Sequence, residues 1–254
     1  YQKKSEVMFM ETKVAFITGA NKGLGLEMAR QLATKGILVY MAGRDLKKVE
    51  TAVNDLKKLN LDVVTILCDV TKCLQIKDAV AIIEKREGKL DILINNAGIM
   101  LDSGGWMENN AATVSLEIMR KTYETNVFGV VDVTQQFLPL LKKARAARIV
   151  NLGSVLGSLT LHAQPGSPVY DAKCLAYNSS KAALNAVTIH FAHALKDTKI
   201  KVNTAHPGWV KTDLGTEHAP MSVQDGAKTG VDLALLDDNG PTSGFFHMGD
   251  KLPW

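Results

Sequence analysis

Cysteine, long apolar runs and concentrated charge are all scarce in this sequence, and each scarcity excludes a class of protein. The three cysteines, Cys68, Cys73 and Cys174, are an odd number and include no C-x-x-C pair. This argues against a disulfide framework and against a structural zinc site. No apolar run approaches the roughly 18 residues that cross a bilayer, and the N-terminal residues lack the apolar segment of a signal peptide. We therefore expect a cytoplasmic protein with no bound metal and no membrane association.

Charge is almost balanced and is scattered along the chain. The 30 Lys and Arg residues stand against 26 Asp and Glu residues, which gives a formal net charge of +4. The densest basic cluster, Lys142, Lys143 and Arg145, is typical of the polar end of a helix, whereas nucleic-acid binding requires a dense basic stripe. We therefore expect a small-molecule partner and no nucleic acid.

What the sequence has instead is an alternation of short apolar runs and longer amphipathic stretches. The apolar runs predict strands at Val14–Thr18, Ile37–Ala42, Val63–Cys68, Ile92–Asn95, Arg148–Leu152, Lys201–Thr204 and Gly244–His247. The amphipathic stretches predict helices at Leu24–Thr34, Leu46–Leu59, Leu74–Arg86, Val114–Lys143 (with a break at Gly129 left open), Ala176–Leu195 and Val223–Leu236.

This alternation is typical of repeated β-α-β units around a parallel sheet. The strands are apolar almost throughout, which indicates helices on both faces. We predict an α/β fold with one doubly wound parallel sheet, with residues 1–10 as an N-terminal extension and residues 11–254 as a single domain. Irregular structure is expected at Met100–Ala112, Gly157–Cys174 and Pro207–Met221, which follow strands at the edge where such sheets bind ligands.

The first strand leads directly into a glycine-rich turn, Thr18–Gly25, and then into a helix. Glycines there permit a tight turn and let backbone amides approach a pyrophosphate at the helix N-terminus. A strand–helix turn without a ligand would use the same residues. The T-G-x-x-x-G-x-G pattern nevertheless resembles the cofactor turn of the classical short-chain dehydrogenase/reductases, and the resemblance extends from Lys13 to about Thr212. It implies a Rossmann-like, dinucleotide-binding catalytic domain, with cofactor contacts from Gly19, Asn21, Lys22, Gly23, Leu24 and Gly25.

The end of the second strand predicts which nicotinamide cofactor is bound. A carboxylate there would bond the ribose hydroxyls of NAD, but the family's discriminating position falls near Gly43. Arg44 follows, and its planar guanidinium suits a 2′-phosphate. Lys22 offers a second positive charge, as in similar NADP-preferring proteins. We expect NADPH/NADP+. The alternative for Arg44 is a surface residue at the start of a helix without a ligand, and Asp45 would be the N-cap of that helix.

Further cofactor contacts follow from the resemblance alone. It implies that Asp69 contacts the adenine amino group, beside Val70, although Asp69 and Thr71 could simply cap the next helix. The N-N-A-G motif and the P-G motif are implied to line the adenine ribose and the nicotinamide, through Asn96, Ala97, Gly98, Pro207, Gly208, Val210 and Thr212.

Tyr177 and Lys181 are spaced i, i+4 on a predicted helix and therefore share one face. A free Tyr ionises near pH 10, and a neighbouring ammonium lowers that pKa. We predict that Lys181 tunes Tyr177, and that Tyr177 passes a proton to a carbonyl oxygen. Both residues are also expected to contact the cofactor, Lys181 through its ribose. Ser154, at the end of a strand, matches the family's catalytic Ser and would bond the same oxygen. Asn126 matches the residue that bends a helix and holds relay water.

Several neighbouring residues compete for these roles. Ser158 is a rival for Ser154, and Tyr170 with Lys173 is a weaker rival for the Tyr–Lys pair because its spacing is i, i+3. Ser179 and Ser180 are read either as nicotinamide neighbours or as small packing residues. We read His190, His193 and His206 as structural or surface residues, and we leave open a pocket role for Met100, Trp106, Met107 and Trp209.

We therefore predict a carbonyl reductase-like enzyme in which NADPH reduces an aldehyde or ketone. A pocket that is mostly apolar would suit a hydrophobic carbonyl compound. The alternatives are an oxidative alcohol dehydrogenase and an NADP(H)-binding redox sensor without turnover. The stretch between Ser154 and Tyr177 is longer than is usual in the family. Similar carbonyl reductases carry a larger insertion there that obstructs a tetramer contact, so we expect a monomer or homodimer.

Overall fold

One twisted sheet runs through the molecule in the computed structural model, which describes residues 12–102 and 111–254. The strand order is β3-β2-β1-β4-β5-β6-β7-β8. The strands are β1 (Val14–Ile17), β2 (Leu38–Gly43), β3 (Val63–Leu67), β4 (Ile92–Asn95), β5 (Arg148–Leu152), β6 (Lys201–Ala205), β7 (Gly244–His247) and β8 (Asp250–Lys251). The helices are α1 (Gly23–Thr34), α2 (Leu46–Lys57), α3 (Cys73–Glu87), α4 (Leu116–Tyr123), α5 (Gly129–Lys143), α6 (Leu159–Ala163), α7 (Leu175–Ala194) and α8 (Val223–Ala234).

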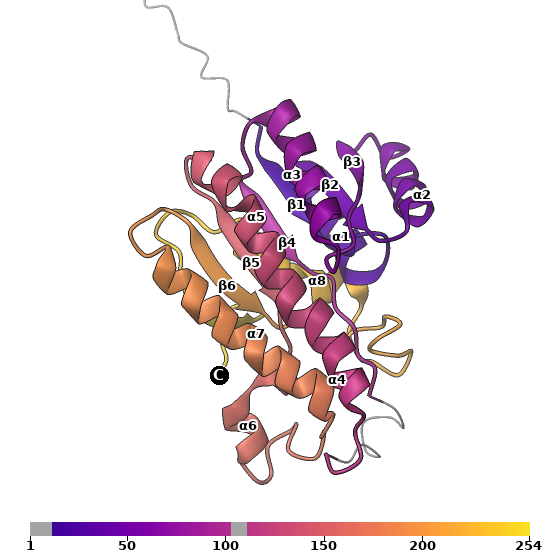
Figure 1. The fold of residues 1–254 in the computed structure, drawn as a ribbon, viewed down its shortest axis with the longest axis vertical. Helices are drawn as coiled ribbons and strands as arrows, with labels where there is room; N and C mark the ends of the chain where they lie inside the picture. Colours follow the sequence, from indigo (N-terminus) through magenta and orange to yellow (C-terminus); the bar gives the residue numbers. More distant parts are fainter. Residues whose placement is uncertain (1–11, 103–110) are drawn as a thin grey trace, which may run out of the picture.

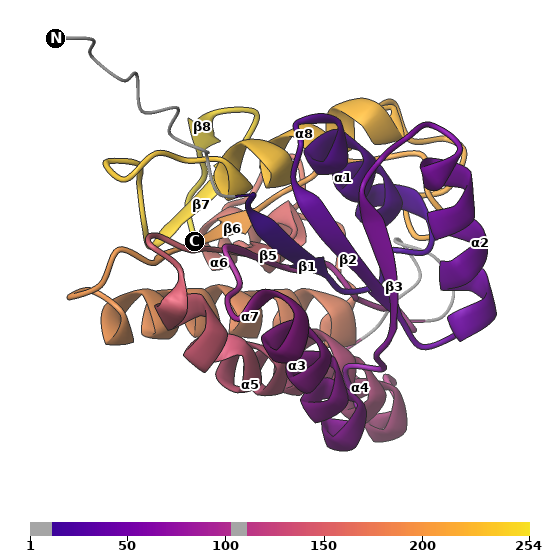
Figure 2. The same cartoon turned by 90° about the horizontal axis from the view of Figure 1, so that it is seen from above.

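Helices cover both faces of the sheet, as the apolar strands predict. Figure 2 shows α1, α2 and α8 on one side and α3, α5 and α7 on the other. Two separate cores fill the two interfaces: side chains such as Met28 and Leu32 pack on the first face, and Phe16, Phe137 and Ile83 on the second. The prediction of a doubly wound α/β fold is confirmed.

The structure departs from the predicted elements at three places. The last strand, β8, is exposed and pairs antiparallel with β7, so the sheet is not wholly parallel. The predicted helix Val114–Lys143 is two helices that divide at Gly129, where the sequence leaves a break open, but they are joined by an unpredicted π-helical turn, η1 (Glu124–Phe128). The segment Gly157–Cys174 was expected to be irregular, but it contains α6 and follows a 3-10 turn, η2 (Val155–Gly157). These pieces are too short to give a periodic signal in the sequence.

The chain order reverses between β1 and β4, which lie side by side although two strands separate them in sequence (Figure 1). Connections therefore diverge at this point and leave room at the carboxyl ends of the strands, which is where such sheets bind ligands.

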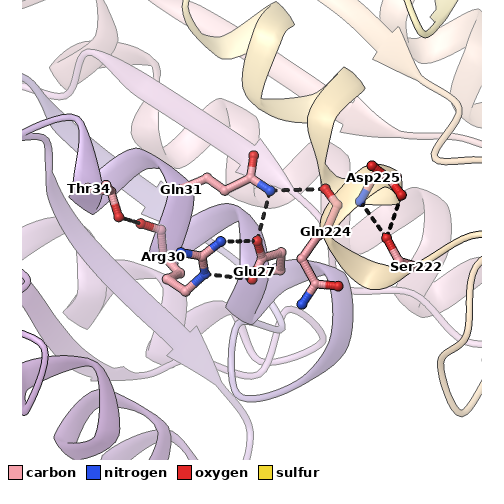
Figure 3. A network of polar contacts seen from close by, with 7 residues as sticks. All are labelled: Glu27, Arg30, Gln31, Thr34, Ser222, Gln224 and Asp225. Carbon is pink, nitrogen blue, oxygen red and sulfur yellow. Dashed lines mark hydrogen bonds and ion pairs between the residues drawn. The ribbon is translucent and has the colours of Figure 1, made fainter.

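A polar network fixes α1, which starts at this point, against α8. Arg30 donates to both carboxylate oxygens of the buried Glu27, at 2.8 and 2.6 Å. Gln31 bonds to Glu27 at 2.8 Å and to the backbone oxygen of Gln224 on α8 at 3.0 Å, as Figure 3 shows. A buried carboxylate is tolerated when its oxygens are satisfied in this way. The N-terminus of α1 is thereby held in a fixed place relative to the sheet.

Among the described residues, the search for a helix both long and apolar enough to span a bilayer finds no candidate.

Candidate active site

A cavity of about 1000 Å³ opens at the carboxyl ends of β1, β4, β5 and β6. All the residues assigned to the cofactor from the sequence line it, together with Ser154. The lining residues are Gly19, Asn21, Lys22, Gly23, Leu24, Gly25, Arg44, Asp69, Val70, Asn96, Ala97, Gly98, Tyr177, Lys181, Pro207, Gly208, Val210 and Thr212. Asn126 alone of the predicted site residues is absent from the lining, because it is fully buried behind it.

The glycine turn is shaped for close approach of a ligand to the backbone. Gly19 and Gly23 have positive φ values of 64° and 56°, a conformation that glycine adopts without strain. A Cβ at Gly25 would lie 2.5 Å from both the Asn96 amide nitrogen and the Gly19 carbonyl oxygen, so no other residue fits there. Lys22 caps α1 without a side-chain hydrogen bond, and the first turn of the helix carries no acidic residue. The amides of this turn therefore suit an anion.

Asn96 holds the turn in place from the neighbouring strand. Its side chain donates to the carbonyl oxygens of Thr18 and Gly19 at 2.8 and 3.0 Å. The backbone amides of Asn96 and Ala97 in turn donate to the Thr18 hydroxyl, each at 3.0 Å. The N-N-A-G motif thus joins the ends of β1 and β4.

The two cations expected near a 2′-phosphate differ in their surroundings. Arg44 is exposed at the end of β2, lines the cavity and makes no ion pair with another described residue. Lys22 instead forms an ion pair with Asp213 across the mouth of the cavity, and this pair holds the pKa of Asp213 below its usual value. Asp45 caps α2 by accepting from the Lys48 amide. Arg44 is therefore the cation that the structure leaves available.

Asp69 makes a turn before α3 rather than the helix cap itself. Its Oδ1 accepts from the backbone amide and the hydroxyl of Thr71, at 3.0 and 2.8 Å. The helix starts at Cys73, with Lys72 in the cap position. The second carboxylate oxygen of Asp69 is left over from these bonds, and Asp69 lines the cavity.

Ser154, Tyr177 and Lys181 converge on the far side of the cavity from Arg44's strand. Ser154 follows β5, and Tyr177 and Lys181 lie one turn apart on α7, with all three side chains buried. The Lys181 ammonium donates to the Leu152 carbonyl oxygen at 2.8 Å and lies 5.6 Å from the centre of the Tyr177 ring. A phenol, a hydroxyl and an ammonium are therefore directed at one space.

Burial governs the ionisation of this group. It raises the pKa of the Tyr177 phenol to about 12, although the hydrogen bond with Ser154 acts in the opposite direction. Burial also lowers the pKa of Lys181 to about 8. The pKa of the Tyr177 phenol thus lies above its usual value, not below it as the pairing with Lys181 alone would predict, because removal from water disfavours the charged form of each group.

Asn126 sits in the π-helical turn η1 and uses its whole amide to hold a neighbouring segment. It accepts from the Ile99 amide at 2.8 Å and donates to the Ile99 carbonyl oxygen at 2.8 Å. Its second hydrogen goes to the Ser180 hydroxyl at 3.0 Å. The side chain thus fixes the backbone after β4 against α7.

The rival residues are placed elsewhere. The Ser158 hydroxyl caps α6 through Leu161, and Lys173 lies over the Tyr170 ring at 4.7 Å. None of these rival side chains lines the cavity. Ser179 and Ser180 both bond back to carbonyl oxygens of α7. Of the competing residues, Ser154, Tyr177 and Lys181 are thus the ones that line the cavity.

Of the described residues for which the sequence leaves a pocket role open, one lines the cavity. Trp209 lines the cavity. Met100 packs against the apolar cluster that contains Tyr177 but is not part of the cavity lining. Trp106 and Met107 lie outside the described residues.

His206, read from the sequence as structural or surface, lines the cavity. Its Nδ1 lies 3.3 Å from the amide of Val155 and 3.4 Å from that of Gly208, and accepts from both. The ring therefore ties the loop after Ser154 to the P-G turn, where Gly208 has a φ of 88°. Burial, and the neighbouring His247, lower the pKa of His206 to about 3. The local sequence does not indicate this role, because it arises only where the ends of two strands meet in the fold.

The sequence and the fold of the chain are both similar to those of known proteins. The family model described as short chain dehydrogenase matches residues 13–222. Salutaridine reductase from Papaver bracteatum is 33% identical over 304 residues, which covers 94% of this chain and 95% of that protein. The (+)-neomenthol dehydrogenase from Capsicum annuum is 31% identical over 302 residues and covers 93% and 96%. The NADPH-bound carbonyl reductase from chicken fatty liver superposes with a TM-score of 0.83 at 28% identity, covering 96% of this chain and 100% of that one.

The low pKa of His206 predicts a loss of stability in acid. An unfolded His takes up a proton near pH 6.5, whereas His206 stays neutral in the fold down to about pH 3. Its contribution is complete above pH 6.5 and is lost as the pH falls towards 3, at about 1 kcal/mol per pH unit. His206→Asn keeps an acceptor but cannot titrate. Urea unfolding at pH 7 and pH 5 should show about 1–2 kcal/mol more loss in the wild type than in this variant.

The control for this measurement is His190→Asn, on the exposed side of α7. It should lose as much stability in acid as the wild type does. Equal losses in His206→Asn and the wild type would show that His206 already titrates normally.

Proposed function

The chain belongs to the short-chain dehydrogenase/reductase family, and we propose that it reduces the carbonyl group of a hydrophobic aldehyde or ketone with NADPH. Membership of the family makes it an oxidoreductase that uses a nicotinamide cofactor. The observation that carries the proposal is the convergence of Ser154, Tyr177 and Lys181 in the cavity that the glycine turn also lines.

The residues around the cavity suit a dinucleotide of this kind. We assign the pyrophosphate to the amides of the glycine turn, the adenine to Asp69 and Val70, and the nicotinamide to the P-G segment. Arg44, exposed and without an ion pair among the described residues, would hold the 2′-phosphate in a forked pair of hydrogen bonds. When bound, NADPH supplies the hydride.

The chain's own residues would handle the oxygen and its proton. The Ser154 hydroxyl bonds the carbonyl oxygen as negative charge develops there, and the Tyr177 phenol delivers a proton to it. Lys181 binds the cofactor ribose and keeps a positive charge beside the phenol. Both amide hydrogens of Asn126 are used within the fold, so a relay water would donate to the second lone pair of its oxygen or bond to main-chain groups nearby.

The pKa of Tyr177 favours reduction over oxidation. At about 12 it keeps the phenol protonated at neutral pH, ready to act as an acid. An alkoxide is a stronger base than the phenolate, because alcohols are weaker acids than phenols, so proton transfer from Tyr177 to it is downhill. Oxidation of an alcohol would require the phenolate, which burial disfavours. The protonated phenol and the fit of Arg44 to a 2′-phosphate together support reduction with NADPH over oxidation of an alcohol.

The substrate half of the cavity suits an apolar carbonyl compound. Leu156 and Val169 pack in one apolar cluster with Tyr177, against which Val155 and Ala172 also pack, and all four line the cavity. The lining also includes Pro168, Leu214 and the half-exposed Trp209. Such a lining favours a substrate whose apolar groups are removed from water and whose carbonyl oxygen is its main polar atom. We propose a hydrophobic ketone or aldehyde for this space.

We also propose that the protein is a monomer or homodimer. The longer segment before α7 packs along that helix: the Asn178 amide donates to Ala172 at 2.6 Å and lies 3.3 Å from His162. The segment would thereby hinder the packing of a partner helix against this part of α7.

Removal of the phenol hydroxyl tests the proposed chemistry. In Tyr177→Phe we expect NADPH consumption with a panel of hydrophobic ketones to fall by about 10²- to 10⁴-fold, since the proton donor is lost. The dissociation constant for NADPH, from fluorescence titration, should stay within about twofold because no charge is removed. Tyr170→Phe, whose ring lies outside the cavity lining, is the matched control and should keep full activity.

Two results would count against the proposal. Turnover in Tyr177→Phe equal to that of the wild type would mean that another group is the acid. Tight NADPH binding by the wild type with no turnover on any ketone or aldehyde would favour a redox sensor.

Arg44 should decide between NADPH and NADH. Arg44→Ala removes a charge-assisted contact worth about 1.5–3 kcal/mol, so kcat/KM for NADPH should fall about 10- to 100-fold. The value for NADH should change little, because NADH has no 2′-phosphate. Lys47→Ala removes the same charge from the exposed start of α2, outside the cavity lining, and serves as the control. A parallel loss with both cofactors would refute the assignment.

The pKa of Lys181 predicts a fall in activity in alkaline solution. The proposed role needs the ammonium, which is present below about pH 8 and lost above it. The pH profile of kcat/KM for NADPH reports the free protein, and it should decline about tenfold per pH unit above pH 8. In Lys181→Arg the guanidinium stays charged, so the profile should be level to pH 10 at a lower activity. A wild-type profile level to pH 10 would contradict this.

A further inference from the structure

The N-terminus of α7 is capped by a residue from a distant part of the chain. The first amides of a helix have no partner within it, and the side chain of Cys174, in the cap position, does not bond to them. Asp102 supplies two instead. Its Oδ2 accepts from the amide of Ala176 and its Oδ1 from that of Tyr177, each at 3.0 Å.

This arrangement differs from the other side-chain caps of the described helices. In α2, α4, α6 and α8 the capping side chain belongs to the residue just before the helix: Asp45, Ser115, Ser158 and Ser222. Asp102 lies 74 and 75 positions from its partners. It is therefore a tertiary contact, and one of the two amides that it holds is that of Tyr177 itself.

The backbone that carries Asp102 is fixed to the rest of the site. Its neighbour Ile99 makes both main-chain hydrogen bonds to Asn126. Between them, Met100 packs against the apolar cluster that contains Tyr177. A Cβ at Gly98 would lie 3.4 Å from the Lys181 ammonium nitrogen, so the backbone passes close to that side chain as well. Residues 98–102 thus connect the end of β4 to the start of α7.

We propose that Asp102 is a positioning residue for Tyr177, which it holds at the cavity by its two hydrogen bonds to the first turn of α7. The inference rests on the proposed function, in which the phenol donates the proton. Charge-assisted bonds at a helix N-terminus stabilise its first turn. A displacement of about 1 Å at a reacting group costs about 100-fold in rate, so fraying of this turn should lower kcat and leave the cofactor half of the cavity unchanged.

Replacement of the carboxylate tests this role directly. We expect Asp102→Ala to lower kcat about 10- to 100-fold, with the NADPH dissociation constant within about twofold of the wild type. Asp102→Asn keeps one acceptor oxygen and should recover part of the loss. Ser115→Ala removes the cap of α4, outside the cavity, and should leave kcat unchanged. Full activity in Asp102→Ala, or an equal loss in Ser115→Ala, would overturn the inference.

A double-mutant cycle distinguishes positioning of Tyr177 from a general structural effect. If Asp102 acts through the phenol, Asp102→Ala should cause no further loss of the residual turnover in a Tyr177→Phe background. The same fold-loss in both backgrounds would mean that Asp102 supports the structure as a whole, and would overturn the proposal.

A spectroscopic measurement keeps this test separate from the proposed activity. In protein carrying tyrosine labelled with carbon-13 at the ring Cζ, the Tyr177 signal is identified by its disappearance in Tyr177→Phe. It should shift in Asp102→Ala and stay in place in Ser115→Ala. An unshifted signal would overturn the positioning role, whether or not the wild type reduces a ketone. Absence of turnover in the wild type, with a shifted signal, would instead remove only the proposed function.

Discussion

The site depends on keeping a phenol and an ammonium group together in a space from which water is largely removed. Burial pushes both groups towards their neutral forms, and the surrounding structure has to hold them in place against that cost. The ammonium nitrogen of Lys181 is bonded to the Leu152 carbonyl oxygen at the end of β5. At Gly157 a Cβ would lie 2.7 Å from the backbone of Lys181, so α7 rests directly on the turn η2. The pair is thus held by backbone contacts that tolerate little displacement.

A chain of buried polar side chains fixes α7 over the sheet below this pair. The Asn95 amide donates to the Asn151 side chain at 2.8 Å, and Asn151 donates to the Thr188 hydroxyl at 2.8 Å. Thr188 is in turn 2.8 Å from the Thr204 hydroxyl. The chain passes from β4 through β5 and α7 to β6. Because buried polar groups are costly when unpaired, it specifies one register of the helix on the sheet.

The sequence predicted the parts of this structure that depend on local pattern. The strand–helix alternation was sufficient for the fold, and the positions of Ser154, Tyr177 and Lys181 at a strand end and on one helix face were sufficient to bring them to one cavity. Asp102 and His206 could not be found in this way, because their partners come from distant segments that only the folded chain brings together.

The direction of a pKa shift is equally inaccessible from spacing. The i, i+4 pair predicts attraction between an ammonium and a phenolate, but the extent of burial decides which effect is larger, and burial is a property of the whole site. The departures at β8, α6 and η1 have a related cause: each is too short, or too similar to an α-helix, to leave a periodic signal.

The two-residue strand β8 also limits how the sheet can grow. It covers the outer edge of β7 with an antiparallel pair whose side chains, Asp250 and Lys251, are exposed and carry opposite charges. A long, flat, apolar edge would offer unpaired amides and carbonyls to a strand of another molecule, whereas a short charged edge gives such a strand little to pair with. This end of the sheet is therefore protected against edge-to-edge aggregation.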